Sequence, residues 1–247
     1  MKVKKKVLGI VGIRSGSTEL KHKNIKLLGN KPLVGWILDA AKNSKYINRI
    51  IVSTDSKKYK KIVEKHKADA PFLRPKNLSR SNSNEIDFVK HALKYLKKRE
   101  NYTPDIVVRM LATVPFQKTK DIDKLIELIL NKKYESAVIV SKAKQHPRKA
   151  LKIVGKKIKH LVSYATNKGI DVGKNLNRQK HKNDEVYFRS NVIACNISVI
   201  KKHSSLTDNR VGYLIISNKE FIDIDNKEDF KFAEYLYFKN FKNINNK

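Results

Sequence analysis

The sequence VLGIVGI at residues 7–13, followed directly by RSGSTELKHKN at residues 14–24, decides the fold and indicates a first site. A short apolar run of this kind is typical of a strand buried in a parallel sheet. In the polar loop that follows, backbone N–H groups near Gly16 and Ser17 can hold phosphate oxygens. Arg14 can make a two-pronged contact, and Lys23 adds a point charge. The loop predicts a polyphosphate site, with an ordinary polar strand-to-helix connection as the alternative.

The loop belongs to neither of the two commonest nucleotide-binding motifs. The chain has no G-x-x-x-x-G-K-[ST] sequence, and Gly9, Gly12 and Gly16 do not have the G-x-G-x-x-G spacing. The prediction of a nucleotide site therefore depends on the chemistry of the loop and on its place after a strand.

Short apolar runs alternate with segments of helical periodicity up to residue 140. We expect strands at 7–13, 49–53, 105–110 and 136–140, and helices at 32–42, 57–66, 85–99 and 121–130. This order predicts an α/β fold, a single doubly wound and mostly parallel sheet of Rossmann-like type, with ligands at the carboxyl ends of its strands. Pro32 suits a first helical turn, and Asp55 or Ser56 is expected to cap the second helix.

After residue 140 the alternation breaks. Residues 142–191 are rich in Lys, His and Asn and carry weak strand signals. We therefore expect one domain over residues 1–247, with residues 142–191 as an excursion that covers the site or contacts a second subunit. No internal repeat or low-complexity linker divides the chain.

The formal net charge of +32, over 247 residues, raises nucleic acid and anionic membranes as alternative partners. The basic residues are mostly Lys, are spread from Lys2 to Lys247, and form no long block interleaved with aromatic residues. This distribution favours a solvated lysine surface over a nucleic-acid interface. Its field would still concentrate a polyanionic substrate.

The apolar runs, the N-terminal segment and the single cysteine all bear on the cellular location. No apolar run approaches the roughly 20 residues that cross a bilayer, and the Lys-rich start lacks a signal-peptide cleavage site. The lone Cys195 excludes an internal disulfide and fits a reducing compartment. We expect a cytoplasmic protein without a membrane partner.

The segment FIDID at residues 221–225 is the second strong signal. On a strand, Asp223 and Asp225 would share one face, and two carboxylates so placed suit Mg²⁺. The alternative is local, because residues 225–228, DNKE, also form a good capping box for the helix that follows. Capping would explain Asp225 but not Asp223.

Several motifs together resemble the acylneuraminate (CMP-sialic acid synthetase-like) cytidylyltransferase family. Its opening pattern is R-x-G-S, K-N, K-P-L and V-S-T-D, and this chain has these pieces, in order, at residues 14–17, 23–24, 31–33 and 52–55. The pattern continues with R-P at 74–75, H-A-L at 91–93, an H-P stretch at 146–147 and an R-Q segment at 178–179. The resemblance covers nearly the whole chain.

The resemblance implies an enzyme that joins CTP to an acidic sugar, a 2-keto-3-deoxy acid of sialic, pseudaminic or legionaminic type, and releases pyrophosphate. It implies Mg²⁺ on Asp223 and Asp225, catalytic roles for Arg14 and Lys23, and a homodimer. The residues expected to bind the nucleotide are Arg14, Ser15, Gly16, Ser17, Lys23, Asn24 and Arg74. Those expected to bind the sugar are Thr113, Arg178, Gln179 and Asn191. Arg178 can hold a carboxylate through two parallel hydrogen bonds, with Arg189 as a competitor and a surface arginine in a basic loop as the alternative.

The chain departs from the family at three positions, to which the family roles are not carried over. Thr18 replaces a lysine of the phosphate loop, Glu85 stands where a small hydroxyl residue is usual, and Leu111 replaces a glutamine that faces the sugar. The version ATVPF at residues 112–116 is more similar to enzymes acting on pseudaminic acid and related bacterial sugars. The alternatives are a nucleotidyltransferase for another sugar, a family member that binds nucleotide without turnover, and a basic nucleic-acid-binding protein.

Overall fold

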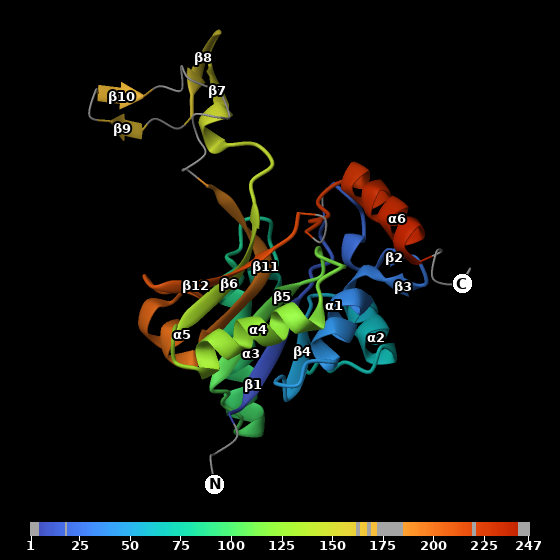
Figure 1. The fold of residues 1–247 in the computed structure, drawn as a ribbon. Coiled ribbons are helices and arrows are strands. Elements are labelled where there is room, and N and C mark those ends of the chain that lie inside the picture. Colours follow the sequence, from blue (N-terminus) through green and yellow to red (C-terminus); the bar gives the residue numbers. More distant parts are fainter. Residues whose placement is uncertain are drawn as a thin grey trace.

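The computed structural model describes residues 5–17, 19–161, 164–166, 169–171, 185–218 and 221–241. The strands of its central sheet are β1 (Val7–Gly12), β4 (Arg49–Ser53), β5 (Ile106–Leu111), β6 (Ser136–Lys142), β11 (Tyr187–Asn196) and β12 (Val211–Ile216). They lie in the order β12-β6-β11-β5-β1-β4 (Figure 1). β1 is parallel to β4 and β5, and β12 is parallel to β6, whereas β11 is antiparallel to both of its neighbours. The predicted α/β fold with a mostly parallel sheet is confirmed.

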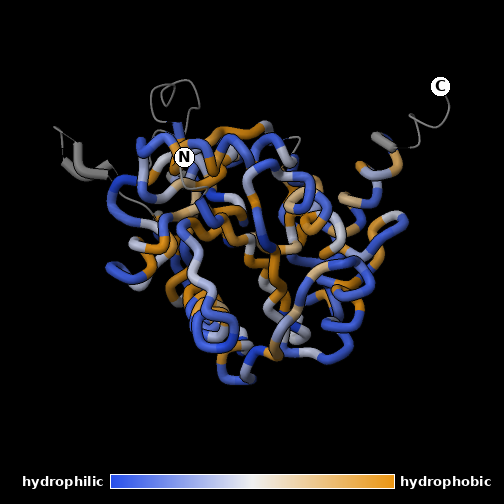
Figure 2. Tube along the Cα trace, turned by 90° about the horizontal axis from the view of Figure 1, so that it is seen from below, coloured by the Kyte–Doolittle hydropathy of each residue, from blue (hydrophilic) through white to orange (hydrophobic). Residues whose placement is uncertain are grey.

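Helices cover both faces of the sheet because its strands are apolar on both sides. Val7 and Val11 of β1 pack in one core cluster with α1 (Leu33–Lys42), α2 (Lys57–Lys65) and α4 (Thr119–Leu130). Leu8 and Ile10 point to the opposite face, into a cluster with α3 (Glu85–Glu100) and α5 (Ile197–His203). Figure 2 shows hydrophobic segments of the trace running through the middle of the molecule. In the part of the chain that the structure describes, no helix is both long and apolar enough to cross a membrane.

Most element bounds agree with the sequence within one or two residues. Ser56 caps α2, since its Oγ accepts a hydrogen bond from the Tyr59 N–H at 3.3 Å. Pro32 lies just before α1 as its cap residue, not inside the first turn.

One expected strand is wrong. Residues 221–225 have no regular secondary structure and pair with no strand of the described sheet, although Ile222 and Ile224 are buried. A backbone hydrogen bond from Ile224 N–H to Thr113 O, 2.9 Å long, holds the segment beside the end of β5. Alternation of apolar and polar residues reports an extended chain, and it does not distinguish a strand from an extended loop.

The smaller elements border the site or extend from the sheet. Those near the N-terminal loop and the C-terminus are η1 (Lys23–Ile25), β2 (Leu27–Leu28), β3 (Lys31–Pro32), η2 (Lys76–Leu78) and α6 (Lys227–Phe241). The expected excursion contains η3 (Pro147–Lys149), β7 (Leu151–Val154), β8 (Lys157–His160), β9 (Tyr164–Thr166) and β10 (Gly169–Asp171). β7 pairs with β8 and β9 with β10, and both pairs stand away from the central sheet (Figure 1).

Candidate active site

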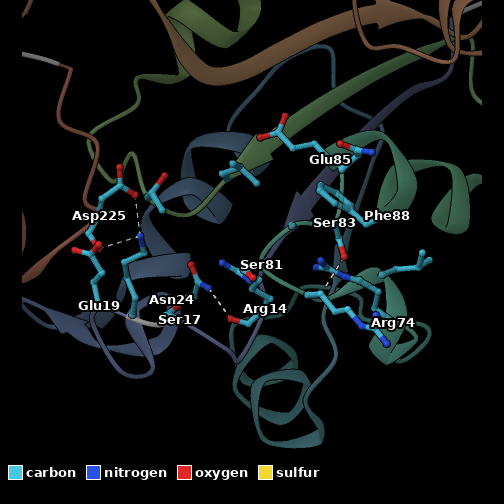
Figure 3. A pocket seen from close by; sticks show the side chains of 17 residues that line it. Arg14, Ser17, Glu19, Asn24, Arg74, Ser81, Ser83, Glu85, Phe88 and Asp225 are labelled. Atoms are coloured by element: carbon cyan, nitrogen blue, oxygen red, sulfur yellow. Dashed lines mark hydrogen bonds and ion pairs between the residues drawn. The ribbon is translucent and has the colours of Figure 1, made fainter. Parts of the chain in front are cut away.

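A cavity of about 510 Å³ opens where β1, β4 and β5 end, at the edge of the sheet where the sequence predicted a ligand (Figure 3). The loop after β1 and the start of α3 form two of its walls. Cationic, acidic and small polar residues line most of it, together with a few apolar ones, and the lining includes Arg14, Ser17, Glu19, Lys23, Asn24, Arg74, Ser83, Glu85, Leu111, Thr113 and Asp225. The structure therefore brings together six of the predicted nucleotide and sugar residues, Arg14, Ser17, Lys23, Asn24, Arg74 and Thr113, and one predicted metal ligand.

The loop after β1 is fixed by hydrogen bonds to the protein. The backbone N–H and the Oγ of Ser15 donate to the two carboxylate oxygens of Asp55, at 2.8 and 2.9 Å. Asn24 donates from Nδ2 to the Arg14 carbonyl oxygen at 2.9 Å. Ser15 and Gly16 are not among the lining residues of the cavity. Ser15 thus holds the loop in place, while the guanidinium of Arg14, which has no ionic partner among the described residues, faces the cavity.

Lys23 and Asp225 close one end of the cavity. The Lys23 Nζ lies 3.1 Å from Asp225 Oδ1, and the Lys23 side chain is 12% exposed against 72% for Asp225. A largely buried ammonium paired with an exposed carboxylate is available to share its charge with an incoming anion. Figure 3 shows Glu19 at the same end of the cavity.

Arg74 forms part of the opposite wall and is buried. Its Nε donates to Ser53 Oγ at 3.1 Å, its Nη2 donates to the carbonyl oxygens of Ile13, at 3.1 Å, and of Ser53, and its guanidinium lies over the Phe88 ring at 4.8 Å. Burial lowers the pKa of Arg74 to about 10, which still leaves it charged at neutral pH. Arg74 therefore ties the ends of β1 and β4 together and shapes the wall, while contact with a nucleotide stays a prediction.

The second predicted metal ligand, Asp223, lies deeper than Asp225. Asn191 donates from Nδ2 to Asp223 Oδ2 at 2.8 Å and to Thr113 Oγ1 at 2.9 Å. The other oxygen, Asp223 Oδ1, is buried and has no hydrogen-bond partner in the described part of the chain. Burial raises the pKa of Asp223 above its ordinary value of 3.8, although the polar groups of its neighbours act in the opposite direction. A cation beside this carboxylate would offset the cost of its buried charge.

The alternative role of Asp225, as the cap of α6, is wrong by one residue. The Asp229 N–H donates to Asn226 Oδ1 at 2.8 Å, and Asp229 Oδ2 accepts from the N–H groups of Asn226 and Asp225, at 3.1 and 3.0 Å. The capping box of α6 is therefore formed by residues 226 and 229, with Asp in place of the usual Glu as its second member. Asp225 is left without a capping role for its side chain.

The two carboxylates fit a magnesium ion. Within the described ranges no group of three or more His, Cys, Asp or Glu side chains could hold a metal by itself. Mg²⁺ does not require one, since it keeps several waters and is commonly bound by one or two carboxylates together with phosphate oxygens. The unpartnered Oδ1 of Asp223 and the exposed Asp225 are a donor set of that type.

A second, larger cavity of about 850 Å³ lies on the other side of the 223–225 segment. Asp223 lines it together with aromatic side chains, lysines and residues of the excursion, among them Lys144, His146, Lys149, Phe188, Phe221 and Phe232. The segment 223–225 thus lies between two cavities, with Asp225 lining the first and Asp223 the second.

One feature of the site was not found from the sequence, and two predicted residues lie outside the described part of the chain. Arg109, inside the apolar run of β5, is fully buried and forms an ion pair with Glu85 at 3.0 Å. A single arginine in a buried strand gives no sequence pattern by which its partner can be identified. Arg178 and Gln179, the expected sugar ligands, are among the residues that the structure does not describe.

Several known proteins are similar to this chain in sequence or in fold. N-acylneuraminate cytidylyltransferase of Escherichia coli O18:K1:H7 is 28% identical over 238 residues, which are 92% of this chain and 51% of that protein, so the chain spans about half of its length. CMP-N,N'-diacetyllegionaminic acid synthase of Legionella pneumophila is 29% identical over 231 residues, 94% of this chain and 96% of that one. A solved structure of a CMP:2-keto-3-deoxy-manno-octonic acid synthetase complexed with CTP has the same fold, with a TM-score of 0.68 at 13% identity over 95% of this chain and 99% of the other.

A family model covers almost the whole domain. The model described as "Cytidylyltransferase" matches residues 8–240, from the first strand to the last helix. The match includes the loop after β1, both cavities and the excursion. This chain therefore belongs to the cytidylyltransferase family.

Proposed function

We propose that this chain transfers the cytidylyl group of CTP to the anomeric hydroxyl of a 2-keto-3-deoxy sugar acid, of sialic, pseudaminic or legionaminic type, and releases pyrophosphate. The observation that carries the proposal is the position of the 223–225 segment between two cavities. A nucleotide in the first and an acceptor in the second would meet at its carboxylates. The named activities of the relatives support the same reaction.

The first cavity offers the charges that a triphosphate needs. Arg14 presents a forked guanidinium and Lys23 a point charge, and Asn24 fixes the backbone between them. Charge-assisted contacts of this kind position the nucleotide and stabilise the negative charge that builds up on the departing pyrophosphate. Such transfer depends mainly on positioning and electrostatics, so no covalent intermediate is required.

Asp223 and Asp225 would hold Mg²⁺, and the metal, when bound, supplies positive charge to the phosphates and the leaving group. Asn191 orients Asp223 through the hydrogen bond to Oδ2 and leaves Oδ1 for the cation. Lys23 keeps Asp225 close to the phosphate end of the first cavity. The hydrogen bond from Asn191 to Thr113 fixes the wall between nucleotide and acceptor.

The second cavity has the chemistry of an acidic sugar that carries apolar substituents. Phe188, Phe221 and Phe232 offer rings to methyl and acyl groups, and Lys144 and Lys149 offer charge to a carboxylate. The predicted contacts of Arg178 and Gln179 to the sugar lie outside the described residues and stay predictions. His146, from the predicted H-P stretch, also lines this cavity.

We further propose a homodimer in the cytoplasm. The hairpin of β7 and β8 exposes apolar side chains, including Leu151, Ile153, Val154 and Ile158, of which Ile153 is 75% exposed. Leu151, Ile153 and Ile158 share one face of the hairpin, because Ile153 pairs with Ile158 and alternate residues of a strand point to the same side. An exposed apolar face on an element that stands away from its own domain is typical of a subunit contact. Light scattering coupled to size exclusion would give a dimer mass, and Ile153→Asp should shift the mass toward the monomer.

The test is release of pyrophosphate from the pure protein with Mg²⁺, each of the four ribonucleoside triphosphates, and a panel of eight- and nine-carbon sugar acids. We expect release with CTP and a nine-carbon acid, and none when either substrate or Mg²⁺ is omitted. Preference for UTP and a sugar phosphate would contradict the proposal. Salt-sensitive binding to DNA without pyrophosphate release would favour the nucleic-acid alternative.

A further inference from the structure

Glu85 and Arg109 form an ion pair in the wall of the nucleotide cavity. Arg109 lies on β5 with a fully buried side chain, and its Nη2 is 3.0 Å from Glu85 Oε2. The other terminal nitrogen, Nη1, donates to the Asn191 carbonyl oxygen at 3.0 Å. Burial lowers the pKa of Arg109 to about 10, while the charge of Glu85 acts in the opposite direction. A buried cation is costly unless it is paired, and the Glu85 carboxylate supplies the opposite charge beside Arg109 through an ion pair that lacks hydrogen-bond geometry.

Glu85 is the first residue of α3 and its side chain is 40% exposed, so its carboxylate both pairs with Arg109 and faces the cavity. Two other carboxylates line this cavity, those of Glu19 and Asp225. Figure 3 shows both on one side of the cavity, where Asp225 pairs with Lys23, whereas Glu85 lies on the side of Phe88. Glu85 is therefore separate from the cation and phosphate machinery.

A carboxylate in a cavity for a polyanion must face a group that donates hydrogen bonds, because an ionised carboxylate only accepts them. A nucleoside triphosphate carries such groups on its ribose and on its base, and none on its phosphates. Asp225 and Arg74 mark the two ends of the cavity in Figure 3, with Glu85 on the wall between them. The ribose links phosphates to base, so it is the part of the nucleotide that passes this wall. Two adjacent hydroxyls match the two oxygens of one carboxylate.

We propose that Glu85 is the residue that selects a ribonucleotide, by accepting hydrogen bonds from the ribose hydroxyls, and that Arg109 is the positioning residue that holds it. The inference depends on the proposed use of a nucleoside triphosphate at this site. Arg109 also prevents the Glu85 carboxylate from repelling the triphosphate. The alternative is purely structural: the negative charge of Glu85, like that of Asp87, would only stabilise the N-terminus of α3.

The experiment measures kcat/KM for CTP, dCTP and UTP in pyrophosphate release, and the dissociation constants of the three nucleotides by calorimetry with Mg²⁺. Glu85→Gln removes the charge and keeps the shape. Glu19→Gln is the matched control, since it changes a carboxylate that lines the same cavity at its other end. Arg109→Met and Arg109→Lys test the positioning role, with melting temperatures to show which variants fold.

We expect the wild type to prefer CTP over dCTP by at least about tenfold, and Glu85→Gln to reduce this preference about tenfold, the size typical of a hydrogen bond to a charged group. The Glu19→Gln preference should equal that of the wild type. Arg109→Lys should keep more of the preference than Arg109→Met. The CTP-to-UTP ratio should not change in Glu85→Gln.

An unchanged CTP-to-dCTP ratio in Glu85→Gln would overturn the proposal, and so would a collapse of the CTP-to-UTP ratio in its place, which would assign Glu85 to the base. If Arg109→Met does not fold, Glu85→Gln decides alone. Should the wild type release no pyrophosphate with any acid, the proposed function fails. The calorimetric ratio of CTP to dCTP still tests Glu85 in that case.

Discussion

Replacing Asp223 by Asn separates the charge of this carboxylate from its shape. Burial raises the pKa of Asp223, so the ionised form is disfavoured in the folded protein. Below its ordinary pKa of 3.8, the Asp223 carboxyl is protonated and its burial does not lower the free energy of unfolding. As the pH rises through the raised pKa, the buried carboxyl has to ionise, and this part of the stability is lost. The amide of the Asp223→Asn variant does not titrate and has no such loss. Without metal and nucleotide, this variant should therefore melt no lower than the wild type at neutral pH, and the difference should move in its favour as the pH rises.

Activity should behave in the opposite way. Two unit charges about 4 Å apart interact by about 4 kcal/mol at an effective dielectric constant near 20, and the loss of one charged ligand from a divalent cation should cost an amount of this order, which corresponds to roughly a thousandfold in rate. We expect pyrophosphate release by Asp223→Asn to fall by about this factor and to recover in part at high Mg²⁺ concentration. Asp123→Asn is a control of the same chemistry, because Asp123 accepts a hydrogen bond from Ser44 outside either cavity.

The decisive measurements are turnover against Mg²⁺ concentration and melting temperature against pH in the presence of a chelator. Normal turnover with normal Mg²⁺ dependence in Asp223→Asn would remove the metal site. A marked loss of melting temperature together with activity would instead show that Asp223 acts through the fold.

Arg14→Ala should lose most of the activity with an unchanged melting temperature, because its guanidinium faces the cavity; unchanged turnover at limiting and saturating CTP would refute this. Lys23→Ala should lose less activity in the same assay, since a point charge orients a phosphate less than a fork does. Asn226→Ala should cost about 1 kcal/mol in chemical unfolding as a lost helix cap, whereas Asp225→Ala should cost about 0.5 kcal/mol or less and impair turnover. His91, whose pKa is lowered by burial and by neighbouring cations, should stay neutral in the fold, so stability is lost as the pH falls below 6.5 and through the lowered pKa. Melting temperatures of His91→Gln should depend less on pH in this range, and an equal dependence would exclude the role of His91.

The core of the fold could be predicted from sequence because buried strands and amphipathic helices have distinct periods. All residues of β1 are apolar or glycine, so both of its faces predict burial, and a sheet with helices on both faces follows. Less of the site could be predicted from the sequence, because tertiary packing determines the hydrogen-bond partners. Arg74 is an example: its motif suggested a nucleotide ligand, and the structure shows three hydrogen bonds to the ends of β1 and β4.

For the 223–225 segment, too, the sequence predicted only part of the local structure. Its alternation correctly indicated that Ile222 and Ile224 are buried and that Asp225 is exposed, but not that Asp223 Oδ1 is buried, and a strand requires a neighbour that the sequence does not name. The cap lies at Asn226 because Asn226 and Asp229 accept hydrogen bonds from each other's backbone N–H groups, one residue later than residues 225–228 would place it. The capping-box motif fits residues 225–228 and residues 226–229 equally well, so the sequence does not distinguish between them.

The antiparallel strand β11 has a consequence for how the enzyme assembles. In the sheet order, β1, β4 and β5 form one half and β6 and β12 the other, and β11 is the strand that joins them. Its residues come after the whole excursion in the chain, so the two halves are joined through contacts distant in sequence, which slow folding. Asn191 lies on this strand and holds Asp223. The two halves, while unjoined, would expose bare strand edges, so conditions that delay the insertion of β11 should produce aggregates in place of an inactive monomer.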